Sequence, residues 1–200
     1  MEKTFQTQLI EAGTDEAGRG CLAGPVFAAA VIFPPDYFNN EINDSKQLSE
    51  KKRSALRDII ISDALTYGVA TCSNQEIDKF NILNCSIMAM HRSLDILTVK
   101  PEFIIIDGNR FKPYGATPYK TIVKGDAKFL SIAAASILAK TFRDEFMISI
   151  DQEFPQYNWR KNKGYPTKDH REAIVEYGLC KYHRLTYGPC ADVLNRLNFE

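Results

Sequence analysis

The sequence predicts an α/β protein. Segments of strand-like hydrophobicity alternate with segments of helical periodicity, and the longest apolar runs have the length of strands. The composition is ordinary for a globular protein, with 44% hydrophobic and 25% charged residues in a chain of 200. A chain of this length forms one core with a small appendage, and it contains no repeat, low-complexity tract or long linker. We therefore expect a single domain over residues 1–200.

The first two strands are expected on either side of a glycine-rich loop. Residues 9–15, LIEAGTD, predict a strand that ends on Asp15. Residues 26–33, VFAAAVIF, are hydrophobic throughout, which is typical of a strand buried on both faces. The stretch between them, EAGRGCLAGP, combines a carboxylate with backbone bare enough for another molecule to lie against it.

The later elements continue the alternation. Leu56, Ile59 and Ile60 recur at helical spacing within residues 50–63. LTYGVATC, at 65–72, predicts a third strand. The remaining expected elements are a helix at 82–97, short strands at 103–107 and 119–123, a long helix at 128–150, and two shorter helices with loops from residue 157 onward.

The sequence argues against membrane and disulfide-rich classes of protein. No apolar run reaches the roughly 18 residues that cross a bilayer, and the amino terminus MEKTFQTQLIEAG lacks the apolar core of a signal peptide. The five cysteines are odd in number, widely scattered and free of C-x-x-C spacing, which argues against a disulfide framework and a zinc site. We therefore expect a cytoplasmic protein with reduced thiols and no membrane partner.

The charges are balanced in total but unevenly placed. The 25 acidic and 25 basic residues predict no polyanionic partner by themselves. Basic residues nevertheless gather in segments 109–128 and 157–171, each of which has five of them against a single acid. The second segment contains YNWRKNKGY, which interleaves aromatic and cationic side chains as a nucleic-acid groove does, although a solvated loop has the same composition.

Acidic residues stand at the ends of three predicted elements. Asp15 and Glu16 follow the first strand, Asp107 ends FIIID, and Asp126 lies in KGDAK. Carboxylates that are buried without a partner are costly, so a convergent group requires cations, supplied by lysine or by metal. Mg²⁺ prefers oxygen ligands and retains waters. Two such ions would activate a water and stabilise the leaving oxygen of a phosphoryl transfer.

The same residues also have simpler interpretations. Acids at element ends are common as caps and solvated turns. GTDEAGRG matches neither a dinucleotide-binding nor a P-loop pattern, so its glycines are also compatible with a plain tight turn. Arg143 and Asp144 are expected to form a structural pair. His170 and His183 are expected either to be structural or to contact phosphate.

Five motifs in chain order carry a family resemblance. They are DEAGRGCLAGPV at 15–26, DSKQLS at 44–49, IDGN at 106–109, KGDAKFLSIAAASILAKTFRDE at 124–145 and KGYPTKDH at 163–170. Together they closely resemble bacterial ribonuclease HII, the type 2 ribonuclease H. The resemblance implies a ribonuclease H-like α/β fold, with a mixed central sheet flanked by helices and residues 151–200 as a helical carboxy-terminal extension.

The resemblance also implies an activity. Such an enzyme cleaves the RNA strand of RNA/DNA hybrids and incises 5′ to single ribonucleotides in duplex DNA, by two-metal-ion hydrolysis with Mn²⁺ or Mg²⁺ that leaves 3′-hydroxyl and 5′-phosphate ends. Its substrates are RNA/DNA hybrids and ribonucleotide-containing duplex DNA, met in ribonucleotide removal and RNA primer degradation. We expect a monomer. The ending VLNRLNFE shows no clear clamp-binding peptide, so docking on a replication clamp is not expected.

The family's motifs assign roles to the same acids. The residues that correspond to its catalytic metal ligands are Asp15, Glu16, Asp107 and Asp126. Gly18, Arg19 and Gly20 correspond to its Gly-Arg-Gly, which reads the ribose 2′-hydroxyl largely through backbone groups. That hydroxyl distinguishes RNA from DNA at a given position.

Three further residues are candidate substrate contacts. Tyr165 corresponds to the family's tyrosine that senses the RNA-DNA junction, and Lys46 to a lysine that contacts phosphate. Ser136, near the start of the long predicted helix, is a candidate phosphate contact, as is Ser131, although small residues in a helix also serve packing.

Three alternatives stay open. Type 3 ribonuclease H shares the fold but adds an amino-terminal substrate-binding domain and has glutamate as its last acid, whereas here the first motif begins at Gly13 and the last acid is Asp126. A hybrid-binding module without catalysis would lack one of the four acids. A metal-dependent phosphatase of small molecules would not require the glycine loop, and a small phosphoester substrate would reveal it.

Overall fold

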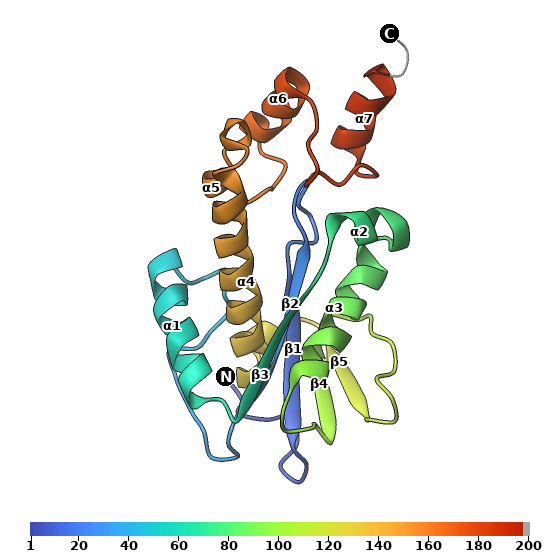
Figure 1. Ribbon diagram of the computed structural model, residues 1–200. Helices are drawn as coiled ribbons and strands as arrows, with labels where there is room; N and C mark the ends of the chain where they lie inside the picture. Colours follow the sequence, from blue (N-terminus) through green and yellow to red (C-terminus); the bar gives the residue numbers. More distant parts are fainter. Residues whose placement is uncertain (198–200) are drawn as a thin grey trace.

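A mixed five-stranded sheet forms the centre of the molecule (Figure 1). The computed structural model describes residues 1–197. The strands, which lie in the order β3-β2-β1-β4-β5, are β1 (Glu11–Ala17), β2 (Val26–Ile32), β3 (Thr66–Cys72), β4 (Phe103–Asp107) and β5 (Tyr119–Ile122). β2 runs antiparallel to β1 and β3, whereas β1, β4 and β5 run parallel. The predicted α/β class and mixed sheet are confirmed.

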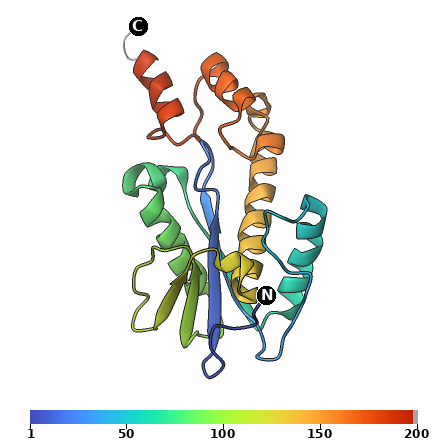
Figure 2. The same ribbon diagram turned by 180° about the vertical axis from the view of Figure 1, so that it is seen from behind.

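Helices cover both faces of this sheet (Figure 2). α4 and α1 lie on one face and α3 lies on the other, preceded by the short α2. The helices are α1 (Glu50–Asp63), α2 (Asn74–Phe80), α3 (Ile82–Ile96), α4 (Leu130–Asp151), α5 (Trp159–Asn162), α6 (Lys168–Tyr177) and α7 (Gly188–Leu197), with 3-10 turns η1 (Gly125–Ala127) and η2 (Pro155–Tyr157). Within the described part of the chain, no helix is both long and apolar enough to span a bilayer.

The hydrophobic run of β2 is buried on both sides, as predicted. Every residue of this strand is buried. Val26, Ala28 and Ala30 join the apolar cluster beneath α3, whereas Ala29 and Val31 join the cluster beneath α4. Because side chains alternate along a strand, a central strand between two helical layers needs apolar residues at consecutive positions.

Small residues let α4 approach the sheet closely. The start of α4 is buried over the run LSIAAASILA. A Cβ atom added at Gly13 of β1 would lie 2.4 Å from the backbone carbonyl carbon of Ser131, so a side chain at this position would force the two elements apart. The close contact fixes where α4 begins relative to the carboxyl end of β1.

The structure differs from the predicted elements in several places: the long helix begins at Leu130 rather than at Lys128, and three helices rather than two follow residue 157. β1 ends at Ala17 rather than at Asp15, because Glu16 and Ala17 still pair with residues of β2. Helix α2 was not predicted. It is short, but it begins with a capping box in which Ser73 and Glu76 bond reciprocally, and the S-x-x-E spacing of that box is visible in the sequence.

The residues after α4 pack against the end of that helix and against the glycine loop. Tyr157, Trp159 and Ile174 share an apolar cluster with Leu22 and Ala23 of the loop. The expected helical character of the carboxy-terminal segment is confirmed by α5, α6 and α7. The end of VLNRLNFE, residues 198–200, lies outside the described residues, so the expectation about a clamp-binding peptide stays a prediction.

Candidate active site

Asp15 and Asp107 lie side by side on neighbouring strands. The parallel register of β1 and β4 pairs Thr14 with Ile106, so the next residues, Asp15 and Asp107, are adjacent and share a face of the sheet. Asp15 is 4% exposed, and its Oδ1 accepts a hydrogen bond from the amide of Glu16 at 2.7 Å. The sheet therefore brings together two of the predicted acids from distant parts of the chain.

Glu16 reaches the same end of the sheet from the opposite face. Successive side chains of a strand alternate, so Asp15 faces α4 and Glu16 faces α3. Glu16 lines a small hollow together with Ser86 of α3 and with Asp107. Arg19 donates from Nη1 to Oε1 of Glu16 at 3.1 Å. Asp107 thus has one acid on each side of it.

Asp126 is placed by the turn η1, which Asp107 holds. The amide of Gly125 donates to Oδ1 of Asp107 at 2.7 Å. Asp126 itself is 3% exposed, and its Oδ2 lies 3.0 Å from Nζ of Lys46. The side chain of Lys46 is 76% exposed, so the ammonium approaches the acids from the solvent side.

The acids disfavour one another's ionisation. Burial, then the charges of Glu16 and Asp107, raise the pKa of Asp15 well above its ordinary value. Burial raises the pKa of Glu16, with Arg19 opposing that shift and Asp107 adding to it. For Asp107, burial and then Asp126 raise the pKa. Asp107 is therefore the acid that interacts electrostatically with each of the other three.

This arrangement fits divalent cations. Carboxylate oxygens are the ligands that Mg²⁺ and Mn²⁺ prefer, and mutual repulsion among anions is what a bound cation relieves. Within residues 1–197 no three or more His, Cys, Asp or Glu side chains lie in a group that could hold a metal ion, so the acids do not form a closed cage. A closed cage is not required, because Mg²⁺ at phosphate-processing sites is held by one or two carboxylates together with waters and substrate oxygens.

The glycine loop, residues 18–25, lies beside these acids with several carbonyls turned toward buried arginines. Arg184 donates to two carbonyls at the start of the loop. Arg143 donates to the carbonyls of Ala23 and Pro25, each at 3.1 Å. Arg184 was not among the residues predicted from the sequence, and no local pattern around it indicates burial.

The expected pairing of Arg143 with Asp144 is wrong. Asp144 accepts instead from Lys140, one turn earlier in α4, at 2.7 Å. Arg143 is fully buried and also donates to the carbonyl of Lys163 at 2.8 Å. It therefore joins the glycine loop to the segment that carries Tyr165.

Tyr165 lies next to the glycine loop and is 40% exposed. The amide of Leu22, in the loop, donates to the carbonyl of Gly164 at 2.8 Å, which fixes the two segments against each other. Lys140 and Arg143 place cations 5.6 and 6.0 Å from the centre of the tyrosine ring. The structure thus brings together the predicted ribose loop and the predicted junction sensor.

Ser136 faces protein groups. It is 5% exposed, and its hydroxyl oxygen lies 2.9 Å from that of Ser45. Ser136 also lowers the pKa of Asp15 and so opposes the upward shift that burial causes. A phosphate contact by Ser136 stays a prediction, and its hydroxyl contacts Ser45 in this structure. Ser131 is likewise 5% exposed.

His170 and His183 lie inside the carboxy-terminal extension, at 0% and 1% exposure. Because both side chains are buried, neither can contact a phosphate directly, and the structural interpretation of the two histidines holds. Trp159 donates from Nε1 to Nε2 of His170 at 3.0 Å, so the ring proton is on Nδ1, which donates to the carbonyl of Tyr165 at 2.9 Å. Burial lowers the pKa of His170, and burial followed by the charge of His170 lowers the pKa of His183 to about 3.

These histidines predict a loss of stability in acid. The unfolded chain takes up protons on both rings near the ordinary value of 6.5, whereas the folded chain does so only at lower pH, so stability is complete above 6.5 and falls as the pH drops toward about 3. Over this range His183 contributes about 1.4 kcal/mol per pH unit, and His170 acts in the same direction. Urea unfolding of His183→Asn at several pH values is expected to show a shallower decline than the wild type.

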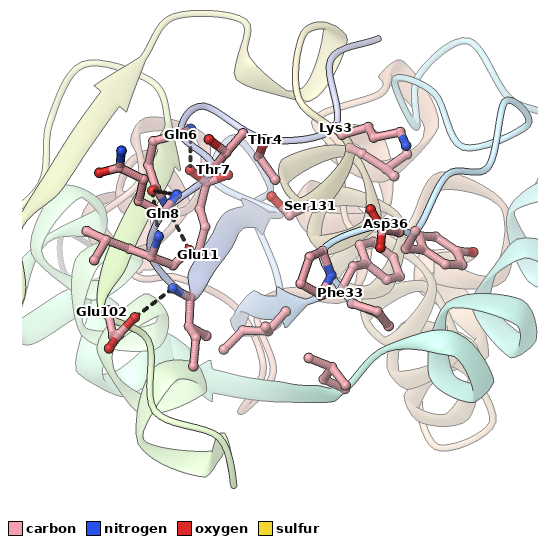
Figure 3. A pocket seen from close by; sticks show the side chains of 18 residues that line it. Lys3, Thr4, Gln6, Thr7, Gln8, Glu11, Phe33, Asp36, Glu102 and Ser131 are labelled. Carbon is pink, nitrogen blue, oxygen red and sulfur yellow. Dashed lines mark hydrogen bonds between the residues drawn. The ribbon is translucent and has the colours of Figure 1, made fainter.

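Only a small hollow lies beside two of the acids, Glu16 and Asp107, among the pockets of the described residues. The hollow beside Glu16 and Asp107 measures about 30 Å³, roughly the space of one water. A larger cavity of about 380 Å³ lies at the start of β1, where residues 3–11 form one wall and Ser131 contributes to the other (Figure 3). Pockets that enclose a small molecule usually exceed about 300 Å³. The site at the acids therefore suits a polymer that lies across it better than an enclosed small substrate.

Comparison with curated protein sequences gives close matches along nearly the whole chain. Ribonuclease HII of Christiangramia forsetii is 59% identical over 194 residues, which cover 97% of this chain and 98% of that protein. Ribonuclease HII of Bacteroides thetaiotaomicron is 58% identical over 191 residues, with 96% of both chains covered.

Comparison with solved structures confirms the fold. The ribonuclease H2 of Pyrococcus horikoshii superposes with a TM-score of 0.81 at 24% identity, and covers 95% of this chain and 99% of its own. A Bst-RNase HIII solved with Mn²⁺ gives a TM-score of 0.75 at 18% identity and covers 96% of this chain but 71% of its own. The family model described as Ribonuclease HII matches residues 12–190, a range that includes every acid and loop described above. The chain belongs to the ribonuclease HII family.

Proposed function

We propose that this ribonuclease H cleaves RNA within RNA/DNA hybrids and incises duplex DNA 5′ to single embedded ribonucleotides, with two divalent ions, Mg²⁺ or Mn²⁺, at its acids. The observation that supports the proposal is that Asp15, Glu16, Asp107 and Asp126 come together at one end of the sheet, beside the glycine loop. Removal of ribonucleotides from DNA and degradation of RNA primers are the roles that such an activity serves.

The proposed reaction is hydrolysis of one phosphodiester bond. The oxygen of a water molecule bonds to phosphorus, and the bond from phosphorus to the upstream 3′ oxygen breaks. The upstream strand leaves as a 3′-hydroxyl, and the ribonucleotide keeps a 5′-phosphate. Bound Mg²⁺ or Mn²⁺ supplies the Lewis acidity that such a step needs. The neighbouring Bst-RNase HIII structure contains Mn²⁺, in keeping with this choice of metals.

The residues of the site divide the work. Asp15, Glu16, Asp107 and Asp126 would hold the cations. Lys46 is free to exchange Asp126 for a substrate phosphate, because the remainder of its side chain lies in solvent. Burial lowers its pKa, but the hydrogen bond and charge of Asp126 outweigh that effect and keep the ammonium protonated.

One assay tests the proposed function directly. The wild-type protein is incubated with a DNA duplex that contains a single ribonucleotide, with Mg²⁺, with Mn²⁺ and with chelator, beside an all-DNA duplex of the same sequence. We expect one cut, 5′ to the ribonucleotide, only with metal and only in the first duplex. Cleavage of the all-DNA duplex, or hydrolysis of a small phosphoester in place of either duplex, would contradict the proposal.

Tyr165→Phe is expected to reduce cleavage at a single ribonucleotide about tenfold, and Tyr165→Ala further, because the hydroxyl and then the stacking face are lost. Cleavage within a uniform hybrid should change less, because it presents no RNA-DNA junction at the cut. Tyr177→Phe, on an exposed tyrosine of α6, is the matched control. Equal losses on both substrates would argue against junction sensing by Tyr165.

A further inference from the structure

Two buried arginines support the glycine loop without acidic partners. Arg143 and Arg184 are both fully buried, and within residues 1–197 neither forms a salt bridge with a carboxylate. A buried charge is costly unless other groups solvate it. Here backbone carbonyls solvate the two guanidinium groups, and most of these carbonyls belong to the loop of residues 18–25.

Arg184 donates hydrogen bonds to three carbonyls of the glycine loop. Its Nη2 donates to the carbonyl of Gly18 at 2.8 Å, its Nη1 to the carbonyl of Arg19 at 2.9 Å, and its Nε to the carbonyl of Gly24 at 3.0 Å. Arg184 lies 160 to 166 residues away from these three positions, on the segment between α6 and α7. The carboxy-terminal extension is therefore hydrogen-bonded to the glycine loop through Arg184.

Tyr187 completes the same contact. Its hydroxyl donates to the carbonyl of Arg19 at 2.8 Å and accepts from Nη1 of Arg184 at 3.1 Å. The carbonyl of Arg19 thus accepts hydrogen bonds from both Arg184 and Tyr187. The Tyr187 hydroxyl also hydrogen-bonds the guanidinium of Arg184 and helps to fix its position. Removal of this one hydroxyl would weaken both contacts without deleting the ring.

The hydrogen bonds from Arg184 also determine where the loop amides point. In a trans peptide the carbonyl and the following N–H point in opposite directions. Because the carbonyls of Gly18 and Arg19 point inward at Arg184, the amides of Arg19 and Gly20 point away from it. Neither amide donates to an acceptor in the part of the chain that the structure describes. The Cβ side of Gly20 is also open, with no atom within 4 Å.

We infer that Arg184 and Tyr187 are positioning residues for ribose selectivity, which aim the two free amides of the glycine loop at the 2′-hydroxyl of the substrate. This inference rests on the proposed function, because it concerns how the same site tells ribose from deoxyribose. It makes the carboxy-terminal extension part of substrate recognition even though neither residue touches the substrate.

Binding measurements separate positioning from general support of the fold. The duplex with a single ribonucleotide and its all-DNA counterpart are titrated with protein in Ca²⁺, which allows binding without rapid turnover. The wild type is expected to prefer the first duplex. Tyr187→Phe is expected to reduce that preference about three- to tenfold, and Arg184→Lys to reduce it further, while affinity for the all-DNA duplex stays unchanged.

Tyr182→Phe is the matched control, because it removes a hydroxyl in the same segment that bonds Glu153 rather than the loop. It should keep the wild-type preference. If Tyr187→Phe keeps the preference too, or loses affinity for both duplexes equally, the two residues support the fold alone and the inference is overturned. If the wild type itself does not distinguish the duplexes, the proposed function has failed and the inference fails with it.

Discussion

Asp107→Asn is expected to reduce cleavage of a duplex with one ribonucleotide by about 1,000-fold or more, which corresponds to ~4 kcal/mol of transition-state stabilisation. Asp107 is the acid whose charge acts on, or is acted on by, each of the other three. Loss of its charge therefore weakens cation binding over the whole group. Asp126→Asn is expected to have a similar effect on cleavage and to leave Lys46 without its partner.

The substitution at Asp107 preserves the local structure. The carbonyl oxygen of asparagine still accepts the hydrogen bond from Gly125, so η1 and Asp126 stay in place. Burial and Asp126 raise the pKa of Asp107, so at a pH above that raised pKa the ionised carboxylate destabilises the folded protein relative to the unfolded chain. Without divalent metal, the melting temperature of Asp107→Asn at neutral pH is thus expected to be higher than that of the wild type.

The measurements are single-turnover cleavage, duplex binding and thermal unfolding, made on the same preparations. Binding of the duplex should remain largely intact, because the glycine loop and the basic segments are unchanged. Asp58→Asn, which removes an exposed acid from α1, is the charge-matched control and should cleave normally. Cleavage by Asp107→Asn at the wild-type rate would overturn the assignment of the acids.

Local patterns in the sequence were sufficient to predict most of the fold. The continuous hydrophobicity of β2 predicted burial on both faces, and the helical spacing of Leu56 and Ile60 predicted the face of α1 that is buried. The end of β1 was misplaced because Asp15 and Glu16 are polar. Their position inside the strand is set by pairing with β2, which a local pattern does not contain.

The acids could be predicted from the sequence, but the side chains that contact the acids and the glycine loop could not. An acid at the end of a predicted strand is a local signal, so Asp107 was found. Lys46 hydrogen-bonds Asp126, which is 80 positions away in the sequence. Arg184 hydrogen-bonds the carbonyl of Gly18, which is 166 positions away. An arginine in a sequence ordinarily indicates solvent or a nearby carboxylate, and Arg143 beside Asp144 suggested such a pair. Solvation of a buried guanidinium by carbonyls requires the tertiary structure to be known.

Alanine at Gly18 and alanine at Gly20 are expected to separate folding from recognition. Gly18 has φ +98°, and an added Cβ would lie 2.0 Å from Nε of Arg143. Backbone strain and displacement of a buried arginine together are expected to cost Gly18→Ala about 3–5 kcal/mol of unfolding free energy. Gly20 has neither a positive φ nor an atom within 4 Å of an added Cβ, so Gly20→Ala is expected to change stability by less than about 0.5 kcal/mol.

Gly20→Ala is nevertheless expected to reduce kcat/KM on the single-ribonucleotide duplex about 10- to 100-fold. The added methyl group would occupy the open side on which the sugar approaches the loop amides. A displacement of about 1 Å at a reacting site reduces the rate by up to about 100-fold. Urea unfolding and cleavage are measured on both variants. Gly188→Ala is the control, since this glycine of α7 also has open space around an added Cβ. Normal cleavage by a stable Gly20→Ala protein would mean that the backbone at this position does not contact the ribose, and that selectivity arises elsewhere in the site.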